Sequence, residues 1–250
     1  MTQRNAGPPR HGFTLVELMV ATTVTTFLFM MMAGMWVGLA GSVVLLLVEH
    51  TVGDSGSGGL GTEVSRALFL GTVARTAGFA TVDVAALSTA GIFLVIMLMM
   101  VGGGSGSTAG GVKVSTVGVI LASLWATVRG REQVTLFHRS IPSGIVQKSF
   151  FLGFMAFFLV TTVTWLVLAI EGTPLMPTLF EVASAVATVG LSFGDGAGRS
   201  LCAGFSDPGK LLVTVCMFIG RLGPLTIGIA VLRTESQQRY RLPSEKVLIG

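Results

Sequence analysis

Residues 149–191 decide the fold and read SFFLGFMAFFLVTTVTWLVLAIEGTPLMPTLFEVASAVATVGL. The first part, residues 149–170, carries no charged residue and is long enough to cross a hydrocarbon core of about 30 Å. A short loop with two prolines follows. The last part, residues 178–191, is too short to span and ends in Thr-Val-Gly-Leu. The stretch therefore predicts a membrane-crossing helix followed by a short segment that enters the membrane and returns.

The composition of the whole chain agrees with a membrane location. Hydrophobic residues make up 51% of the 250 residues and charged residues only 11%, whereas a soluble domain carries roughly 25% charged residues. The mean hydropathy is +0.80. The net charge of +4 could suggest nucleic acid, but the basic residues cluster in short loops beside apolar segments, as orientation signals do. We therefore expect no nucleic-acid partner.

Nothing in the sequence points to an enzyme. Cys202 and Cys216 form no disulfide framework, and the sequence shows neither metal-ligand spacing nor a plausible Ser/His/Asp arrangement. We expect no cofactor and no covalent chemistry.

The same plan occurs in the first half of the chain. An apolar segment at 13–48 and a Gly/Ser loop at 51–62 precede a short segment at 63–79. A second long apolar segment at 85–128 is broken in its middle by glycines, and the last span of the second half is 211–232. An internal repeat of this kind indicates pseudo-symmetry about a shared site. The sequence predicts an all-α polytopic membrane protein with four spans and two helix–re-entrant pore loop–helix repeats.

The distribution of basic residues predicts the orientation. If the N-terminus, the central loop and the tail share one side, that side holds ten of the sixteen Lys and Arg residues, and the other side holds four. The ten are Arg4, Arg10, Arg129, Arg131, Arg139, Lys148, Arg233, Arg239, Arg241 and Lys246, and the four are Arg66, Arg75, Arg199 and Lys210. An excess of basic residues marks the cytoplasmic side. Both short segments then enter from outside.

Each short segment ends in a tetrapeptide that contains one glycine. An ion filter that strips water from potassium needs backbone carbonyls that point inward, and glycine reaches conformations that other residues do not. The sequence Thr-Val-Gly is also the start of a potassium-channel filter. The alternative is that both glycines are ordinary helix C-caps. The predicted ion-binding residues are Thr76, Ala77, Gly78, Phe79, Thr188, Val189, Gly190 and Leu191.

The glycine-rich break between the two apolar runs predicts a gate loop inside the membrane, under the filter. The alternative is an extramembrane loop, which the distribution of basic residues opposes. Arg221 lies in the middle of the last span, where a charge is costly and faces a cavity or a partner; the alternative is a structural role beside Pro224. The predicted gate residues are Gly102, Gly103, Gly104, Ser105, Gly106, Ser107, Thr108, Ala109, Gly110, Gly111, Lys113 and Arg221.

Four separated motifs carry a family resemblance. They are RTAGF at 75–79, MLMMVGGGSGSTAGGVK at 97–113, MFIGRLGPLT at 217–226 and PSEKVLIG at 243–250. In this order they resemble the Trk/Ktr/HKT superfamily, closest to potassium uptake subunits of the KtrB/TrkH type, over about residues 40–250. The resemblance implies four repeats around one filter, a gate loop in the third repeat, an Arg in the last helix, and a cytosolic nucleotide-binding regulatory subunit like KtrA or TrkA.

The chain departs from this family pattern in two ways. It holds two repeats instead of four, which implies a C-terminal fragment, a homodimer, or a chain that does not function alone. Residues 12–21, GFTLVELMVA, resemble a type IV prepilin processing site, with Glu17 at the fifth mature position. We therefore divide the chain into a prepilin-like leader and helix start (1–21), a third-type pore repeat (22–128), a cytoplasmic linker (129–148) and a fourth-type pore repeat with the tail (149–250).

These observations predict a potassium transporter or channel subunit of the bacterial inner membrane that acts through carbonyl coordination. The transported potassium ion is the only ligand we expect. Two alternatives stay open at this point: a pilin-like filament or secretion component, and a non-conducting fragment that only binds partner subunits.

Overall fold

The computed structural model describes residues 15–52, 60–75, 77–80, 83–104, 109–131, 133–136, 139–194 and 199–223. Within these ranges the regular elements are helices and one antiparallel pair of two-residue strands, β1 (Thr135–Leu136) and β2 (Arg139–Ser140), in the central linker. The helices are α1 (Leu15–Val52), α2 (Leu60–Val73), α3 (Thr89–Met100), α4 (Val114–Val128), α5 (Ser143–Glu171), α6 (Leu175–Val186) and α7 (Asp207–Leu222), with 3₁₀ turns η1 (Val84–Ala86) and η2 (Leu201–Gly204).

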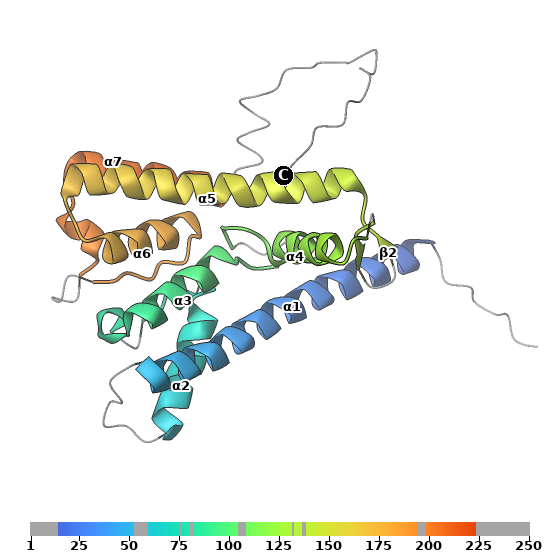
Figure 1. Ribbon diagram of the computed structural model, residues 1–250, viewed down its shortest axis with the longest axis horizontal. Helices are drawn as coiled ribbons and strands as arrows, with labels where there is room; N and C mark the ends of the chain where they lie inside the picture. The colour runs from blue at the N-terminus through green and yellow to red at the C-terminus, as the bar shows by residue number, and fades with distance from the viewer. Residues whose placement is uncertain are drawn as a thin grey trace, which may run out of the picture.

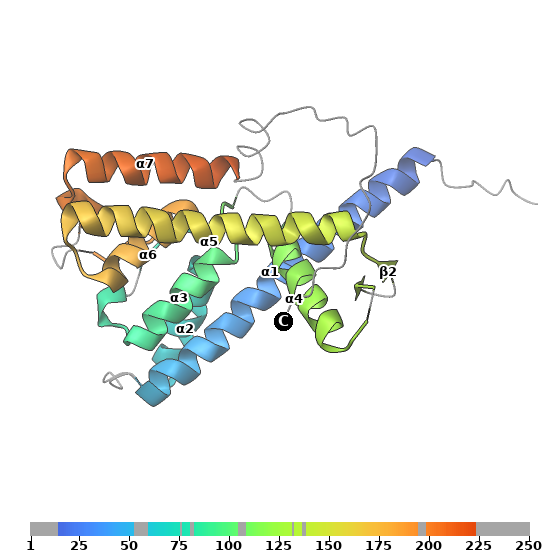
Figure 2. The same ribbon diagram turned by 45° about the horizontal axis from the view of Figure 1, so that its top comes forward.

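The helices follow the predicted repeat. A long helix, a short helix and a further helix occur in this order twice, as α1, α2 and α3 and as α5, α6 and α7 (Figure 1). The break in the second apolar segment is real, since α3 ends at Met100 and α4 begins at Val114. Helix α7 lies along α5, and α6 contacts both (Figure 2).

Several helix boundaries differ from those that hydropathy predicts, and two of them lie at prolines. The apolar span was expected from residue 149, but α5 begins at Ser143 after the N-cap Pro142. Helix α6 begins at Leu175 and not at residue 178, with Pro177 in its first turn. Proline is tolerated there because the first backbone N–H groups of a helix have no partner within the helix. Hydropathy marks the apolar part of a helix, whereas capping residues mark its ends.

In the described part of the chain, two helical segments are long and apolar enough to cross a membrane, Met32–Thr51 and Ser143–Glu171. Helices α3, α4 and α6 are apolar but shorter. The predicted span at 211–232 corresponds to α7, of which the structure describes residues up to 222; the rest of that span lies outside the described residues.

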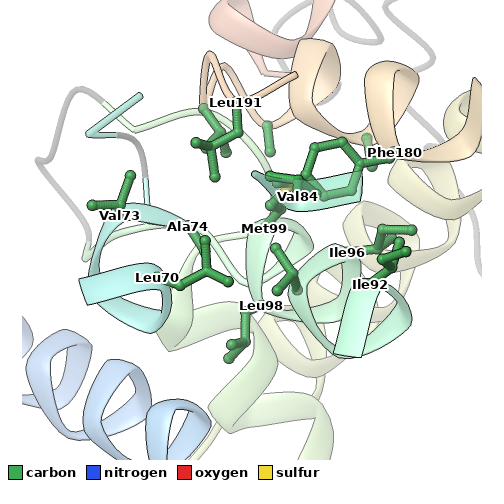
Figure 3. Packing of buried hydrophobic residues seen from close by; sticks show 14 of the residues in the cluster. Leu70, Val73, Ala74, Val84, Ile92, Ile96, Leu98, Met99, Phe180 and Leu191 are labelled. Carbon is green, nitrogen blue, oxygen red and sulfur yellow. The ribbon is translucent and has the colours of Figure 1, made fainter. Parts of the chain in front are cut away.

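The hydrophobic core joins the two repeats. Its larger cluster combines Leu70 of α2, Met99 of α3 and Phe180 of α6, and includes Leu191 of the second predicted filter segment (Figure 3). Helices α3 and α6 are in direct contact. Burial of apolar side chains at this junction, worth roughly 25 cal/mol per Å² of surface removed from water, holds the two short helices at fixed positions.

Candidate functional site

The two predicted filter segments lie side by side. A Cβ atom on Gly78 would lie 2.8 Å from the carbonyl oxygen of Val189, and one on Gly190 would lie 3.5 Å from the Cα of Gly78. Gly78 has φ +70° and Gly190 has φ +86°, a region that residues with a side chain rarely adopt. Both glycines are therefore required by backbone conformation, and Gly78 also by the close approach of the other segment.

The structure argues against the helix-cap interpretation for Gly190. The C-cap of α6 is Ala187, so Gly190 lies three residues beyond the cap. Between them, Thr188 holds φ +53°, which is unusual for a residue with a branched side chain. The amide of Val189 donates to Ser184 O (2.9 Å), which wraps this part of the segment against the end of the helix.

A buried carboxylate binds the chain that directly follows the second predicted filter segment. Glu181 of α6 is only 5% exposed, and it accepts hydrogen bonds from Phe193 N (3.0 Å) and from the hydroxyl of Ser192. The Cys202 thiol also donates to it at 3.5 Å. Ser184 Oγ donates to the carbonyl oxygen of Leu191 (2.5 Å). The chain that follows Gly190 is thus held by two side chains of the short helix that precedes it.

Backbone hydrogen bonds join the two limbs of the glycine-rich loop. Gly102 N donates to Val112 O (2.8 Å), and Val112 N donates to Met100 O (3.2 Å). Gly102 and Gly110 are both buried. A Cβ on Gly102 would overlap Gly110 O, so the limbs touch backbone to backbone. The loop is therefore a compact structure at its base.

One limb contacts the second predicted filter segment, and the other contacts the residue before the first. Gly110 N donates to Thr188 Oγ1 (3.0 Å), and Arg75, which directly precedes the first segment, donates from Nη2 to Gly102 O (2.8 Å). The Arg75 side chain lies against Gly34 and Gly38 of α1, where an added Cβ would be 3.4 Å from it. The base of the loop therefore lies against Arg75 and against the second predicted filter segment; its role as a gate stays a prediction.

Two further cations lie near the loop. Lys113 Nζ donates to Ala109 O (2.8 Å), and the charge of Arg221 is close enough to act on that of Lys113. Arg221 is exposed at the end of α7. A Cβ on the preceding Gly220 would overlap Val186 O, so this end of α7 packs directly on the end of α6. Pro224, which the alternative role of Arg221 requires, lies outside the described residues.

The structure brings Gly78 together with Val189 and Gly190, and Gly110 together with Thr188. The described members of the two predicted sets are Ala77, Gly78, Phe79, Thr188, Val189, Gly190 and Leu191 of the filter, and Gly102, Gly103, Gly104, Ala109, Gly110, Gly111, Lys113 and Arg221 of the gate; their roles stay predictions. Thr76, Ser105, Gly106, Ser107 and Thr108 lie outside the described residues. The sequence prediction missed Glu181 and Ser184. A carboxylate inside an otherwise apolar short helix was the available signal for Glu181, since burying a charge needs compensating hydrogen bonds.

Comparison with known proteins identifies the family. The sequence model of the TrkH family, described as a cation transport protein, matches residues 10–241. The chain belongs to the TrkH family. The match begins at residue 10 and so includes the whole prepilin-like motif at 12–21; that resemblance stays a prediction, and none of the relatives described below is a pilin.

Several relatives are potassium uptake proteins by name. Ktr system potassium uptake protein B of Vibrio alginolyticus is 36% identical over 213 residues, which cover 85% of this chain and 45% of that protein. Ktr system potassium uptake protein D of Bacillus subtilis is 36% identical over 73% of this chain and 39% of its own length. Potassium/sodium uptake protein NtpJ of Enterococcus hirae is 32% identical over 85% of this chain and 47% of its own length.

The fold is also that of a solved transporter. The crystal structure of the potassium transporter TrkH from Vibrio parahaemolyticus superposes with a TM-score of 0.66 at 21% identity, covering 83% of this chain and 44% of that one. The predicted class, a helical membrane protein of the Trk/Ktr type, is therefore confirmed. The chain spans less than half the length of the relatives it matches.

Proposed function

We propose that this chain forms half of a potassium-conducting pore. The observation that carries the proposal is the contact between Gly78 and Gly190, because it places two glycine-bearing segments from equivalent positions of a repeat at one point. Membership of a family of cation transport proteins supports it, and the names of the relatives support potassium as the cation. The protein is then a multi-pass protein of the bacterial inner membrane.

The mechanism is coordination without covalent chemistry. Backbone carbonyl oxygens of residues 76–79 and 188–190 replace the water around the ion. The carbonyl oxygen of Leu191 is already the acceptor of the Ser184 hydroxyl. Helices α2 and α6 end just before these segments, at Val73 and Val186, and the C-terminal end of a helix carries a partial negative charge that stabilises a cation. Glu181 and Ser184 anchor the end of the second segment, Glu181 through Ser192 and Phe193 and Ser184 through Leu191 O.

The glycine-rich loop is proposed as the gate below the filter. Its base is tied to both segments through Arg75 and Thr188, so a change in the loop acts directly on the filter. Lys113 and Arg221 add positive charge beside the loop, which disfavours a cation there.

A closed filter needs further segments besides these two. We propose that a second copy of the chain supplies them in a homodimer, and that a cytosolic nucleotide-binding subunit regulates the assembly. Phe79 at the end of the first segment is 72% exposed, which fits a site that further chain covers.

Rubidium uptake in cells that lack their own potassium transporters tests the proposal. The unmodified chain is expected to take up rubidium. Gly78→Ser and Gly190→Ser are each expected to abolish this uptake, because both place a side chain at positive φ in the proposed filter. Gly130→Ser is the matched control, since Gly130 also has positive φ (+64°) but lies outside the site with no atom within 4 Å of its Cβ position. Uptake that survives both filter substitutions would refute the proposal.

A further inference from the structure

Two glutamates occupy equivalent places at the ends of the long helices. Glu49 lies in the last turn of α1, and Glu171 is the last residue of α5. Each carboxylate accepts hydrogen bonds from the serine that caps a later helix of the same repeat. Glu49 Oε1 accepts from the hydroxyl (2.6 Å) and the amide (3.3 Å) of Ser88, the N-cap of α3.

The second repeat has the same arrangement. Glu171 Oε1 accepts from the hydroxyl (2.5 Å) and the amide (3.0 Å) of Ser206, the N-cap of α7, and Oε2 lies 3.1 Å from the same amide. A carboxylate at a helix N-terminus faces the positive end of the helix dipole. Each pair therefore combines charge-assisted hydrogen bonds with a favourable field.

A glycine makes room for each carboxylate. Gly91 and Gly209 are the third residues of α3 and α7, and a Cβ on either would overlap the Oε1 atom of its glutamate. The two helix starts therefore share the pattern Ser-x-x-Gly, as Ser88-Thr89-Ala90-Gly91 and Ser206-Asp207-Pro208-Gly209. The serine supplies the donors and the glycine supplies the space.

Each pair closes a loop that contains one short helix and one predicted filter segment. Glu49 and Ser88 are 39 residues apart, with α2 and residues 76–79 between them. Glu171 and Ser206 are 35 residues apart, with α6 and residues 188–191 between them. In both repeats, the same glutamate–serine contact therefore joins the two ends of the chain that contains the short helix and the predicted filter segment.

We propose that Glu49 and Glu171 are positioning residues that act as a pair of equivalent clamps. Each clamp fixes the end of the long helix to the start of the later helix, and so fixes the frame in which the short helix holds its filter segment. Its effect on the filter rests on the proposed function; the clamp geometry itself does not.

A double-mutant cycle on thermal unfolding of the full chain in detergent tests the geometry. Gly91→Ala in the unmodified chain should lower the melting temperature by about 5 °C, because the added methyl group displaces the Glu49 carboxylate. In a Glu49→Ala background the same substitution should raise it by about 2 °C, since alanine favours a helix more than glycine does. Gly209→Ala should change sign in the same way in a Glu171→Ala background.

Gly118→Ala is the matched control. Gly118 lies within α4 with no atom within 4 Å of its Cβ position, so its replacement should raise the melting temperature in every background. If Gly91→Ala or Gly209→Ala changes the melting temperature in the same direction with and without the glutamate, the clamp proposal is wrong.

Concentration-dependent rubidium uptake tests the positioning role. Glu171→Gln and Ser206→Ala should each raise the Km for rubidium at least threefold at equal amounts of protein in the membrane. Ser206→Thr keeps the hydroxyl and should leave the Km at the value of the unmodified chain. A loss confined to protein amount or maximal rate would show a merely structural role and overturn the positioning claim. If the unmodified chain transports no rubidium, the proposed function is wrong. The melting temperatures then test the clamp geometry by themselves.

Discussion

At the scale of single residues, the site depends on a few contacts that fix backbone conformation. Gly78 and Gly190 meet at positive φ, and Thr188 reaches an unusual φ while its hydroxyl accepts from the loop. Glu181 is the buried charge that supports this arrangement, through bonds to the residues just after the filter segment. Substitutions here act on conformation more than on packing.

Glu181→Gln should destabilise the second segment. An amide keeps one acceptor oxygen but presents an N–H₂ group where the carboxylate accepts, so at least one donor loses its partner. We expect a fall of about 1–2 kcal/mol in the free energy of unfolding, measured by thermal unfolding in detergent. Glu63→Gln, in the first turn of the other short helix, is the control and should cost only a few tenths of a kcal/mol. Equal losses for both variants would contradict the supporting role.

The Cys202 thiol should be unreactive over the ordinary pH range. Burial and the adjacent Glu181 carboxylate raise its pKa to about 12. A raised pKa keeps the proton on sulfur, so at pH 9 roughly a thousandth of the thiol is the nucleophilic thiolate. Alkylation by iodoacetamide in a Cys216→Ala background should therefore stay slow up to pH 9 and accelerate above pH 10.

Glu181→Gln supplies the control for this titration, because removing the carboxylate should lower the pKa of Cys202 and speed alkylation at pH 9. A rate that already levels off between pH 8 and pH 9 in the unmodified chain would contradict the assignment. The linkage has a definite sign: a raised pKa stabilises the folded state below about pH 8.5, and that contribution is lost as the pH rises towards 12.

Residue patterns predicted some of the site but not all of it. The glycines at 78 and 190 could be found because each repeats at an equivalent place after a short segment. Glu49 and Ser88 could not be paired in advance, since their contact depends on how α1 and α3 pack after 39 residues of intervening chain. Glu181 could be noticed as a charge in an apolar segment, but its partners come from a loop whose path the sequence does not specify.

At the scale of helices, the short helix α6 is held by a direct backbone contact with α7. Gly220 of α7 lies so close to α6 that a Cβ would overlap the carbonyl oxygen of Val186, the last residue of that helix. Small residues allow this kind of approach between membrane helices. The end of α7 therefore packs against the end of α6, after which the second predicted filter segment begins.

Gly220→Ala should push α7 away from α6. The added methyl group would meet the backbone of Val186, which cannot move aside as a flexible side chain can. We therefore expect a loss of about 1–3 kcal/mol in the free energy of unfolding. The melting temperature in detergent measures it, with Gly118→Ala as a helix glycine that has open space around it. An unchanged melting temperature for Gly220→Ala would contradict the close packing of these two helices.

Helix identity followed from hydropathy, whereas helix ends did not. The glycine-rich break between α3 and α4 was visible in the sequence, as were the two short helices. Hydropathy predicts the start of α5 six residues late, because Gln147 and Lys148 are polar yet lie within the helix. Polar residues fit the first turns of a helix when they are exposed, as both of these are.

At the scale of the whole molecule, the chain holds two of the repeats from which we propose that a closed filter is built. Its two repeats share one core, and it covers less than half of the relatives it matches. If a second copy completes the pore, light scattering on the purified protein should give a protein mass twice the 26.0 kDa of one chain. A monomer at all protein concentrations would contradict the homodimer while leaving the geometry of each half unchanged.

The most direct test is the position of a bound ion. A crystal of the full chain grown in rubidium chloride should show an anomalous peak within about 3 Å of backbone oxygens from both segments, residues 76–79 and 188–191. Gly190→Ser should remove this peak, and Gly130→Ser should leave it in place. Rubidium bound elsewhere in the membrane part of an intact structure, with no peak between the two segments, would contradict the account.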